Sequence, residues 1–369
     1  MKKSILLLAL GFSLIHLFNS CKKDDIEPNN HFLPENFSVY VPKLSVFSPL
    51  YKDVPTVLQG IHIDYSAADC ISLSGHVAKM IDTTIAQIRK YNPNPKSNFT
   101  YLSEDDNRAK NVMIYENVEF EGRIWQYQLN ISDADSEENA DDGLGFQLFW
   151  NQSPLEGIAI LRPSNLNMGK LDEFSRATFR VDYSEASNNY EKEMTVYIKG
   201  FEFRSFDYRY IMESLKMTIG RKENITVAYG NANFPDAKVF NNETGYNIAI
   251  VAAGTNSPIS VSSNSRQIIG TAEIGLPSNY LNSTDRKVIL EDYSMKNVFA
   301  NQLMQTEMDP GGVELCLMGT SVPCYYDGIP SLATISPGPE YNECETALKS
   351  LVPFNPSDVT NLQINFKLK

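Results

Sequence analysis

Residues 112–131 read VMIYENVEFEGRIWQYQLNI, and this stretch contains the pattern that decides the fold. Two runs of strand-forming residues flank Glu121-Gly122, which predicts a β-hairpin because a two-residue connection of this kind suits a tight turn. The second run alternates apolar and amide side chains, so we expect one face to pack into a core and the other to meet solvent. The apolar face would consist of Trp125, Tyr127, Leu129 and Ile131.

The same two-residue period returns along much of the chain. Residues 220–224 have the composition of a hairpin loop, and a clean C-terminal run at residues 362–368 is expected to join the sheet as a strand. About ten antiparallel strands are therefore expected. The other runs with a strand signal fall within residues 37–65 (ending at 61–65), 177–183, 194–198, 215–219, 225–229, 248–252, 267–274 and 287–290.

One early segment changes from the strand period to the helical one. Ser72 or Ser74 can cap its N-terminus, and Pro93 stops it. Its apolar stripe needs a sheet to pack against. We therefore predict an α+β fold in which a large antiparallel β-sheet of about ten strands curls over this helix, with a β-sandwich as the alternative. The stripe consists of Val77, Met80, Ile81, Ile85 and Ile88.

Residues 1–25, MKKSILLLALGFSLIHLFNSCKKDD, have the composition of a secretory signal. Two lysines precede an apolar run that is too short for a stable membrane span. The end of that run, Leu17-Phe18-Asn19-Ser20-Cys21, resembles the lipobox of bacterial lipoproteins. The resemblance implies that Cys21 is acylated, becomes the first residue of the mature chain and anchors it through its acyl chains.

The residues after this cysteine indicate a cellular location. Lys22, Lys23, Asp24 and Asp25 look like the export signal with which some Gram-negative bacteria send lipoproteins to the outer face of the outer membrane. The resemblance implies a lipid-anchored outer-membrane protein at the cell surface, and attachment at the periplasmic face is the alternative.

Composition divides the chain into three parts. Residues 1–20 are expected to be the signal peptide and residues 21–36 a flexible tether, which the lipobox resemblance implies is lipid-anchored. Residues 37–369 are expected to form a single antiparallel α+β domain, with a subdivision near residues 231–246 as an open alternative. The later chain is expected to contain helices at residues 291–307 and 341–351 and a proline-rich surface excursion at residues 322–344.

The chain is acidic. Its net charge is −13, and loss of Lys2 and Lys3 with the signal peptide makes it −15. Nucleic acids are therefore not expected as partners, because they need clustered basic residues that the sequence lacks.

Four cysteines follow the lipobox cysteine. In an exported chain an even count allows two disulfides, and four buried thiols are the alternative. No Cys/His spacing suggests zinc. The disulfide candidates are Cys70, Cys316, Cys324 and Cys344.

The sequence contains no recognisable catalytic motif. It has no nucleophile elbow and no phosphate-binding glycine loop, and His62 and His76 lack the spacing of metal ligands. Carboxylates are so plentiful that no pair can be chosen for glycoside hydrolysis. A protein that is not an enzyme is therefore favoured.

An acidic loop follows the second strand of the hairpin. Its oxygen ligands at alternate positions suit Ca²⁺, and a solvated acidic loop is the alternative. Against the EF-hand pattern it has Glu138 in place of the turn glycine and Leu144 in place of the last glutamate. The candidate metal ligands are Asp133, Asp135, Glu137 and Asp141.

Two tryptophans flank this loop. Aromatic rings beside amides can hold sugar rings, and they fill β-sheet cores equally well. Alternation favours the core for Trp125, whereas Trp150 at a strand end is expected to be the more exposed; these two and Tyr127 are the candidate ligand-binding residues. We therefore expect a surface protein that binds an external ligand such as a glycan. The alternatives are a structural or adhesin-type subunit that contacts envelope proteins, and a surface glycan hydrolase.

Overall fold

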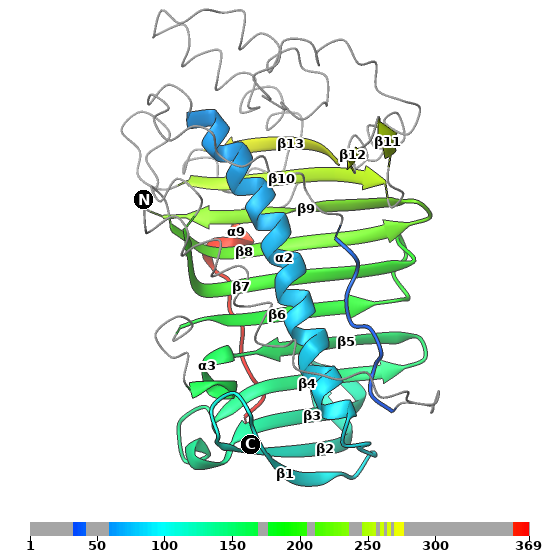
Figure 1. Cartoon of the computed structure of the whole chain (residues 1–369), viewed down its shortest axis with the longest axis vertical. Coiled ribbons are helices and arrows are strands. Elements are labelled where there is room, and N and C mark those ends of the chain that lie inside the picture. The colour runs from blue at the N-terminus through cyan, green and yellow to red at the C-terminus, as the bar shows by residue number, and fades with distance from the viewer. Residues whose placement is uncertain are drawn as a thin grey trace, which may run out of the picture.

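One antiparallel sheet of eleven strands forms the body of the protein, and helix α2 (Gln59–Arg89) runs across its strands (Figure 1). The computed structural model describes only part of the 369-residue chain. Within that part, no helix is long and apolar enough to cross a membrane. The described residues are 32–41, 59–168, 176–204, 211–235, 246–255, 259–261, 264–266, 269–276 and 357–368.

The strands follow one another as an up-and-down meander. From β1 to β10 each strand pairs with its neighbours in sequence, and β13 completes the sheet beside β10. A separate hairpin of β11 and β12 precedes β13 in sequence. The strands are β1 (Asn98–Leu102), β2 (Ala109–Phe120), β3 (Arg123–Asp133), β4 (Leu144–Gln152), β5 (Leu155–Leu161), β6 (Thr178–Ser184), β7 (Lys192–Arg204), β8 (Ile211–Lys222), β9 (Ile225–Phe234), β10 (Tyr246–Thr255), β11 (Ile259–Val261), β12 (Asn264–Arg266) and β13 (Ile269–Leu276).

These ladders confirm the predicted α+β fold, a large antiparallel sheet curled over an early helix. The hairpin that suggested it is present, with Glu121 and Gly122 at φ 51° and 74° between β2 and β3. Two positive φ angles in a two-residue connection match the right-handed twist of the flanking strands. Short helical turns complete the described elements: η2 (Ala134–Ser136), α3 (Pro163–Leu166) and α9 (Ser357–Thr360).

Helix α2 is longer than the sequence pattern predicted. The strand expected at residues 61–65 is wrong, because these residues belong to the helix. Ile61 and Tyr65 are four residues apart, so this short run fits one helix face as well as it fits a strand. Ser74 is not an N-cap either: it is buried in mid-helix, and its hydroxyl donates a hydrogen bond to the Cys70 carbonyl at 2.8 Å.

The apolar stripe of α2 packs on one face of the sheet, which we call the inner face. This packing confirms the helical stripe that the sequence predicted. A fully buried aliphatic side chain of this size contributes about 1.5–3 kcal/mol relative to an exposed one, so the stripe is a major source of stability. Its buried members include Cys70, Ile71, Val77, Ile81, Ile85 and Ile88, and Met80 packs beside them.

The opposite, outer face is covered over its central strands. Two hydrophobic clusters lie on the two faces of the sheet, and we call them the inner and the outer cluster. Alternation along β4 places Phe149 in the outer cluster and Trp150 in the inner cluster. Residues 361–368, which we call the strap, run across this outer face (Figure 1). We expected the amide face of β3 to meet solvent, and that is wrong for Gln128 and Asn130, which are buried. Strands β4 and β5 also bury side chains on both faces.

The strap has the alternation of a strand without being one. Leu362, Ile364 and Phe366 are buried as their spacing predicted. The expected ladder is absent, because the strap crosses the strands and its backbone bonds to side chains instead. Gln147 accepts from the Lys367 N–H at 2.8 Å and donates to the Lys367 carbonyl at 3.0 Å. Lys199 Nζ donates to the Leu362 carbonyl at 2.5 Å.

Several predicted features lie outside the described residues. These are the strand at 287–290, the helices at 291–307 and 341–351, and the proline-rich excursion at 322–344. Of the candidate disulfide cysteines only Cys70 is described: it is buried, with its sulfur 3.8 Å from that of Met212. The subdivision considered near residues 231–246 falls where β9 and β10 pair along their length. The remaining candidates, Cys316, Cys324 and Cys344, are not among the described residues.

A buried ion cluster fixes the end of the sheet where β2 begins and β3 ends. Lys110 has no solvent exposure, and its Nζ lies 2.7 Å from Asp133 Oδ2 and 2.9 Å from Asp106 Oδ2. Arg108 holds the same Asp133 carboxylate through Nε at 2.8 Å and Nη2 at 2.5 Å. The hydrogen bonds of Arg108, opposed by burial and reinforced by Lys110, hold the pKa of Asp133 well below its usual range.

Replacing the buried lysine tests this cluster. Lys110→Met keeps most of the side-chain length but leaves the buried Asp106 carboxylate without its lysine and leaves Asp133 paired with Arg108 alone. We expect the free energy of unfolding, measured by urea denaturation, to fall by about 3–5 kcal/mol.

Lys192→Met is the matched control, because Lys192 pairs with Glu185 at 2.7 Å in a solvent-exposed setting. Its loss should cost less than about 1 kcal/mol. Equal stability of the two variants would contradict the structural role of the cluster.

Candidate functional site

The tip of the β2–β3 hairpin bends away from its neighbours. Asn117 interrupts β2 with φ 54°, and the β3–β4 ladder stops at Tyr127 and Trp150. Beyond that point, Gln126 bonds to the next strand differently: its N–H donates to the Asn151 side chain at 2.9 Å. We call residues 117–126 the flap.

The flap folds over the outer face and reaches β4 and, beyond β5, strand β6. The Phe120 ring stacks on Phe149 of β4 with centroids 4.1 Å apart and an interplanar angle of 3°. Glu121 reaches Arg180 of β6, which is three strands from β3. Trp125 is carried along and joins the outer cluster, so our expectation that it shares a face with Leu129 is wrong.

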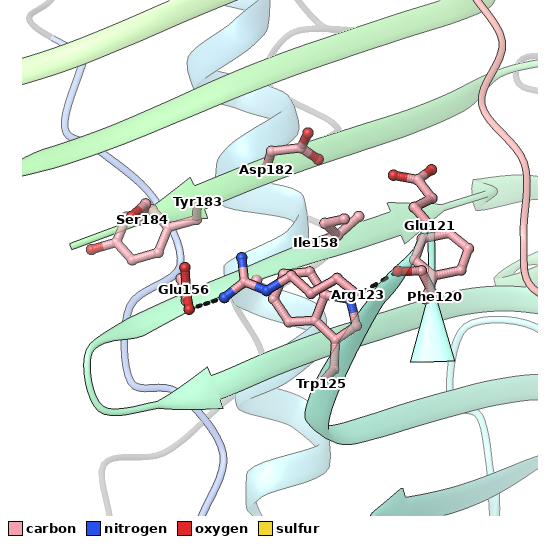
Figure 2. Close-up of a pocket in the computed structure, with 10 residues that line it drawn as sticks. Phe120, Glu121, Arg123, Trp125, Glu156, Ile158, Asp182, Tyr183 and Ser184 are labelled. Atoms are coloured by element: carbon pink, nitrogen blue, oxygen red, sulfur yellow. Dashed lines mark hydrogen bonds and ion pairs between the residues drawn. The ribbon is translucent and has the colours of Figure 1, made fainter. Parts of the chain in front are cut away.

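A cavity of about 290 Å³ lies between the flap and strands β5 and β6. Figure 2 shows Arg123 and Trp125 from the flap facing Glu156 and Ile158 of β5, with Asp182 on the adjacent strand. The site therefore combines aromatic and aliphatic surface with several charged groups. Its lining consists of Phe120, Glu121, Arg123, Trp125, Glu156, Gly157, Ile158, Asp182, Tyr183 and Ser184.

Arg180 organises one side of the cavity. Its guanidinium holds Glu121 through two bonds of 2.6 and 2.8 Å, and Asp182 through two bonds of 2.6 and 3.1 Å. One cation thus fixes a flap residue and a cavity carboxylate together. Burial raises the pKa of Asp182 above its ordinary value, although the bonds from Arg180 oppose that change.

A second ion pair lies on the other side. The Arg123 guanidinium pairs with Glu156 and lies over the Trp125 ring, 4.3 Å from its centroid. Burial alone would raise the pKa of Glu156, but hydrogen bonds from Asn151 and Arg123 bring it below its ordinary value. The Arg123 side chain is 46% exposed. This exposure leaves Arg123 room to move when a ligand enters.

The candidate ligand-binding aromatics are separated by the sheet. Trp150 is 0% exposed in the inner cluster, so the expectation that it is the exposed tryptophan is wrong. Phe32, far away in sequence, covers it with ring centroids 5.3 Å apart. Tyr127 packs on the same inner side, 5.2 Å from the Trp150 ring. Of the three, Trp125 alone lines the cavity, and its role in binding stays a prediction.

The candidate metal ligands are engaged with donors from the protein itself. Asp133 belongs to the buried ion cluster, and Asp135 lies 3.4 Å from Arg108. Glu137 accepts hydrogen bonds from Asn111 at 2.9 Å and Ser132 at 2.8 Å, and Asp141 pairs with Arg162. Among the described residues no group of three or more potential metal-ligating side chains gathers. Calcium binding stays a prediction.

Sequence reasoning missed the residues that define the cavity. Arg180 and Asp182 were visible as polar alternates on one strand, yet nothing local indicated that Glu121 would meet them. Arg123 and Glu156 are likewise 33 residues apart. The lipidation and export residues, Cys21, Lys22, Lys23, Asp24 and Asp25, lie outside the described part of the chain.

Comparison with known proteins gives no relative from which to read the function. No family model, no curated protein and no solved structure matches this chain. The cavity is therefore interpreted from its own chemistry.

Proposed function

We propose that this protein is a lipid-anchored outer-membrane protein, exposed at the cell surface, that binds an external glycan in the cavity beneath the flap. The address rests on the resemblance of residues 17–25 to a lipobox and export signal, with Cys21 as the acylated residue. The binding role rests on one observation: an aromatic and aliphatic cavity surface is combined with carboxylates that arginines hold in place.

The lining suits a sugar. Phe120 offers apolar surface for the C–H face of a pyranose ring, and the Trp125 ring adds to it when Arg123 moves from its face. Glu156 and Asp182 are acceptors for its hydroxyl groups, and Ser184 adds a hydroxyl that can donate or accept. A few polar groups fixed on a mostly apolar surface are what specific small-molecule sites use. The volume, about 290 Å³, fits one residue of a longer chain rather than an oligosaccharide.

The paired charges favour a neutral ligand. Glu156 is compensated by Arg123, while Glu121 and Asp182 share Arg180, so three carboxylates meet two guanidinium groups. This net negative charge would repel a strongly anionic ligand. Each paired carboxylate still has lone pairs available to a hydroxyl group.

A surface glycan hydrolase is the second candidate. Its specific support is that Asp182 and Glu156 line one cavity while their pKa values shift in opposite directions. Such a difference is how one carboxyl group serves as an acid while another stays ionised. A structural or adhesin-type subunit that contacts envelope proteins is the third candidate, and it does not need the cavity.

Two isosteric substitutions test the binding site. We expect Glu156→Gln and Asp182→Asn each to weaken glycan binding, measured by calorimetry with saccharides selected on a glycan array. A hydrogen bond to a charged group is worth about 1.5–3 kcal/mol, and 1.4 kcal/mol corresponds to roughly tenfold in affinity. A loss of at least about tenfold is therefore expected.

Glu119→Gln is the matched control, because Glu119 is exposed on the flap and does not line the cavity. Its binding should equal that of the wild type. Absence of any saccharide binding by the folded wild type would overturn the proposal. Cleavage of a bound glycan that only the two cavity variants lose would establish the hydrolase instead.

The cellular address is tested by protease shaving of intact cells followed by blotting. We expect the wild type to be degraded, and a variant with Asp24→Asn and Asp25→Asn to be protected because it stays on the periplasmic side. Cys21→Ala, which removes the acylated residue, controls for anchoring. If the wild type is as well protected as the variant, the surface address is wrong.

A further inference from the structure

Strand β1 forms one edge of the sheet. Within the described residues it pairs with β2 alone, so its other side carries unpaired backbone groups (Figure 1). The backbone hydrogen bonds at the two ends of β1 show which groups these are. The Ser103 N–H donates to the Arg108 carbonyl at 2.9 Å, and the Ile114 N–H donates to the Ser97 carbonyl at 3.0 Å. Odd-numbered residues therefore face β2. The N–H and C=O groups of the even-numbered residues point to the free edge.

This edge lacks the usual protection against strand pairing. The sequence of β1, NFTYL, contains no lysine, no proline and no bulge against β2. Leu102 is 65% exposed. On the helix side, Phe99 and Tyr101 pack beside Tyr91 with ring centroids 5.2 and 5.4 Å apart. The edge therefore offers both backbone donors and apolar surface to an added strand.

We propose that β1 pairs antiparallel with β1 of a second copy of this chain, with the two-fold axis at Thr100. In this register each residue whose backbone groups point to the free edge pairs with such a residue of the second copy. Asn98 lies opposite Leu102 of the partner subunit, and Thr100 lies opposite the partner's Thr100. Both are hydrogen-bonded pairs, as the parity of the edge requires. Phe99 then lies opposite the partner's Tyr101 as a close cross-strand aromatic pair.

Charge complementarity selects a second copy over an unrelated strand. Lys96 and Glu104 flank β1, each four residues from Thr100, and both are exposed. Both lie in the turns that flank β1. The two-fold register therefore brings Lys96 of one copy to the same end of the new ladder as Glu104 of the partner subunit, and the same combination occurs at the other end. A self-complementary edge of this kind is what an isologous dimer interface requires.

The register is tested by cysteine cross-linking of the purified chain with a mild oxidant. Residues opposite each other in a hydrogen-bonded pair have Cα atoms about 5.5 Å apart, within the roughly 4.4–6.8 Å that a disulfide spans. Thr100→Cys should therefore form a covalent dimer on a non-reducing gel. Asn98→Cys should not, because its partner copy lies four residues away, about 14 Å along the strand.

A mixture of Asn98→Cys and Leu102→Cys should cross-link, since these positions oppose each other. Wild-type chain, with its native cysteines, sets the background band. No dimer above that background for Thr100→Cys, or equal dimer for Asn98→Cys alone, would overturn the proposal. Neither result depends on glycan binding, so this test is separate from that of the cavity.

A charge reversal provides a second test of the interface, which does not depend on any cysteine variant folding. Lys96→Glu brings two acids together at both ends of the new ladder and should lower the dimer fraction in light scattering. Adding Glu104→Lys restores opposite charges and should recover it. A dimer fraction indifferent to the single reversal, or not recovered in the double variant, would contradict this interface.

Discussion

The packing of α2 across the inner face of the sheet is the interaction on which the rest of the structure depends. An eleven-stranded sheet exposes two broad faces, and one helix can bury only one of them. The outer face needs another cover, and the strap and the flap supply it with Phe366 and Phe120 among their apolar contacts. The cavity lies where the flap covers strands β5 and β6 of the outer face without filling the space above them.

The local part of this arrangement was predictable and the remainder was not. Periods of two and of three to four residues depend on neighbours in sequence, so most of the strands and the stripe from Val77 to Ile88 were found. Strands β1 and β5 were not among the expected runs, and the runs at 61–65 and 362–368 are not strands. The exposure of Trp150 was misjudged because Phe32 covers it from far away in the chain. Trp125 left its predicted face because the flap bends at Asn117.

The candidate site likewise combines local features that the sequence predicted with long-range contacts that it did not. Its residues come from the flap and from two strands, and they meet only when the flap crosses the sheet. Arg180 is central to this meeting, because its single guanidinium joins Glu121 to Asp182. Arg180 and Asp182 lie on one strand, but the ion pair that brings the flap to them joins Arg180 to Glu121, 59 positions earlier. Charge pairing over that separation leaves no periodic signal in the sequence.

Hydrogen–deuterium exchange of the flap, with and without the glycan, is the most direct test of the claim that the flap forms the ligand cavity. We predict that ligand slows exchange of the amides of residues 117–126, while the strap, held by Gln147 and Lys199, changes little. Unchanged exchange in the flap at saturating ligand, or slowing confined to another region, would contradict the account.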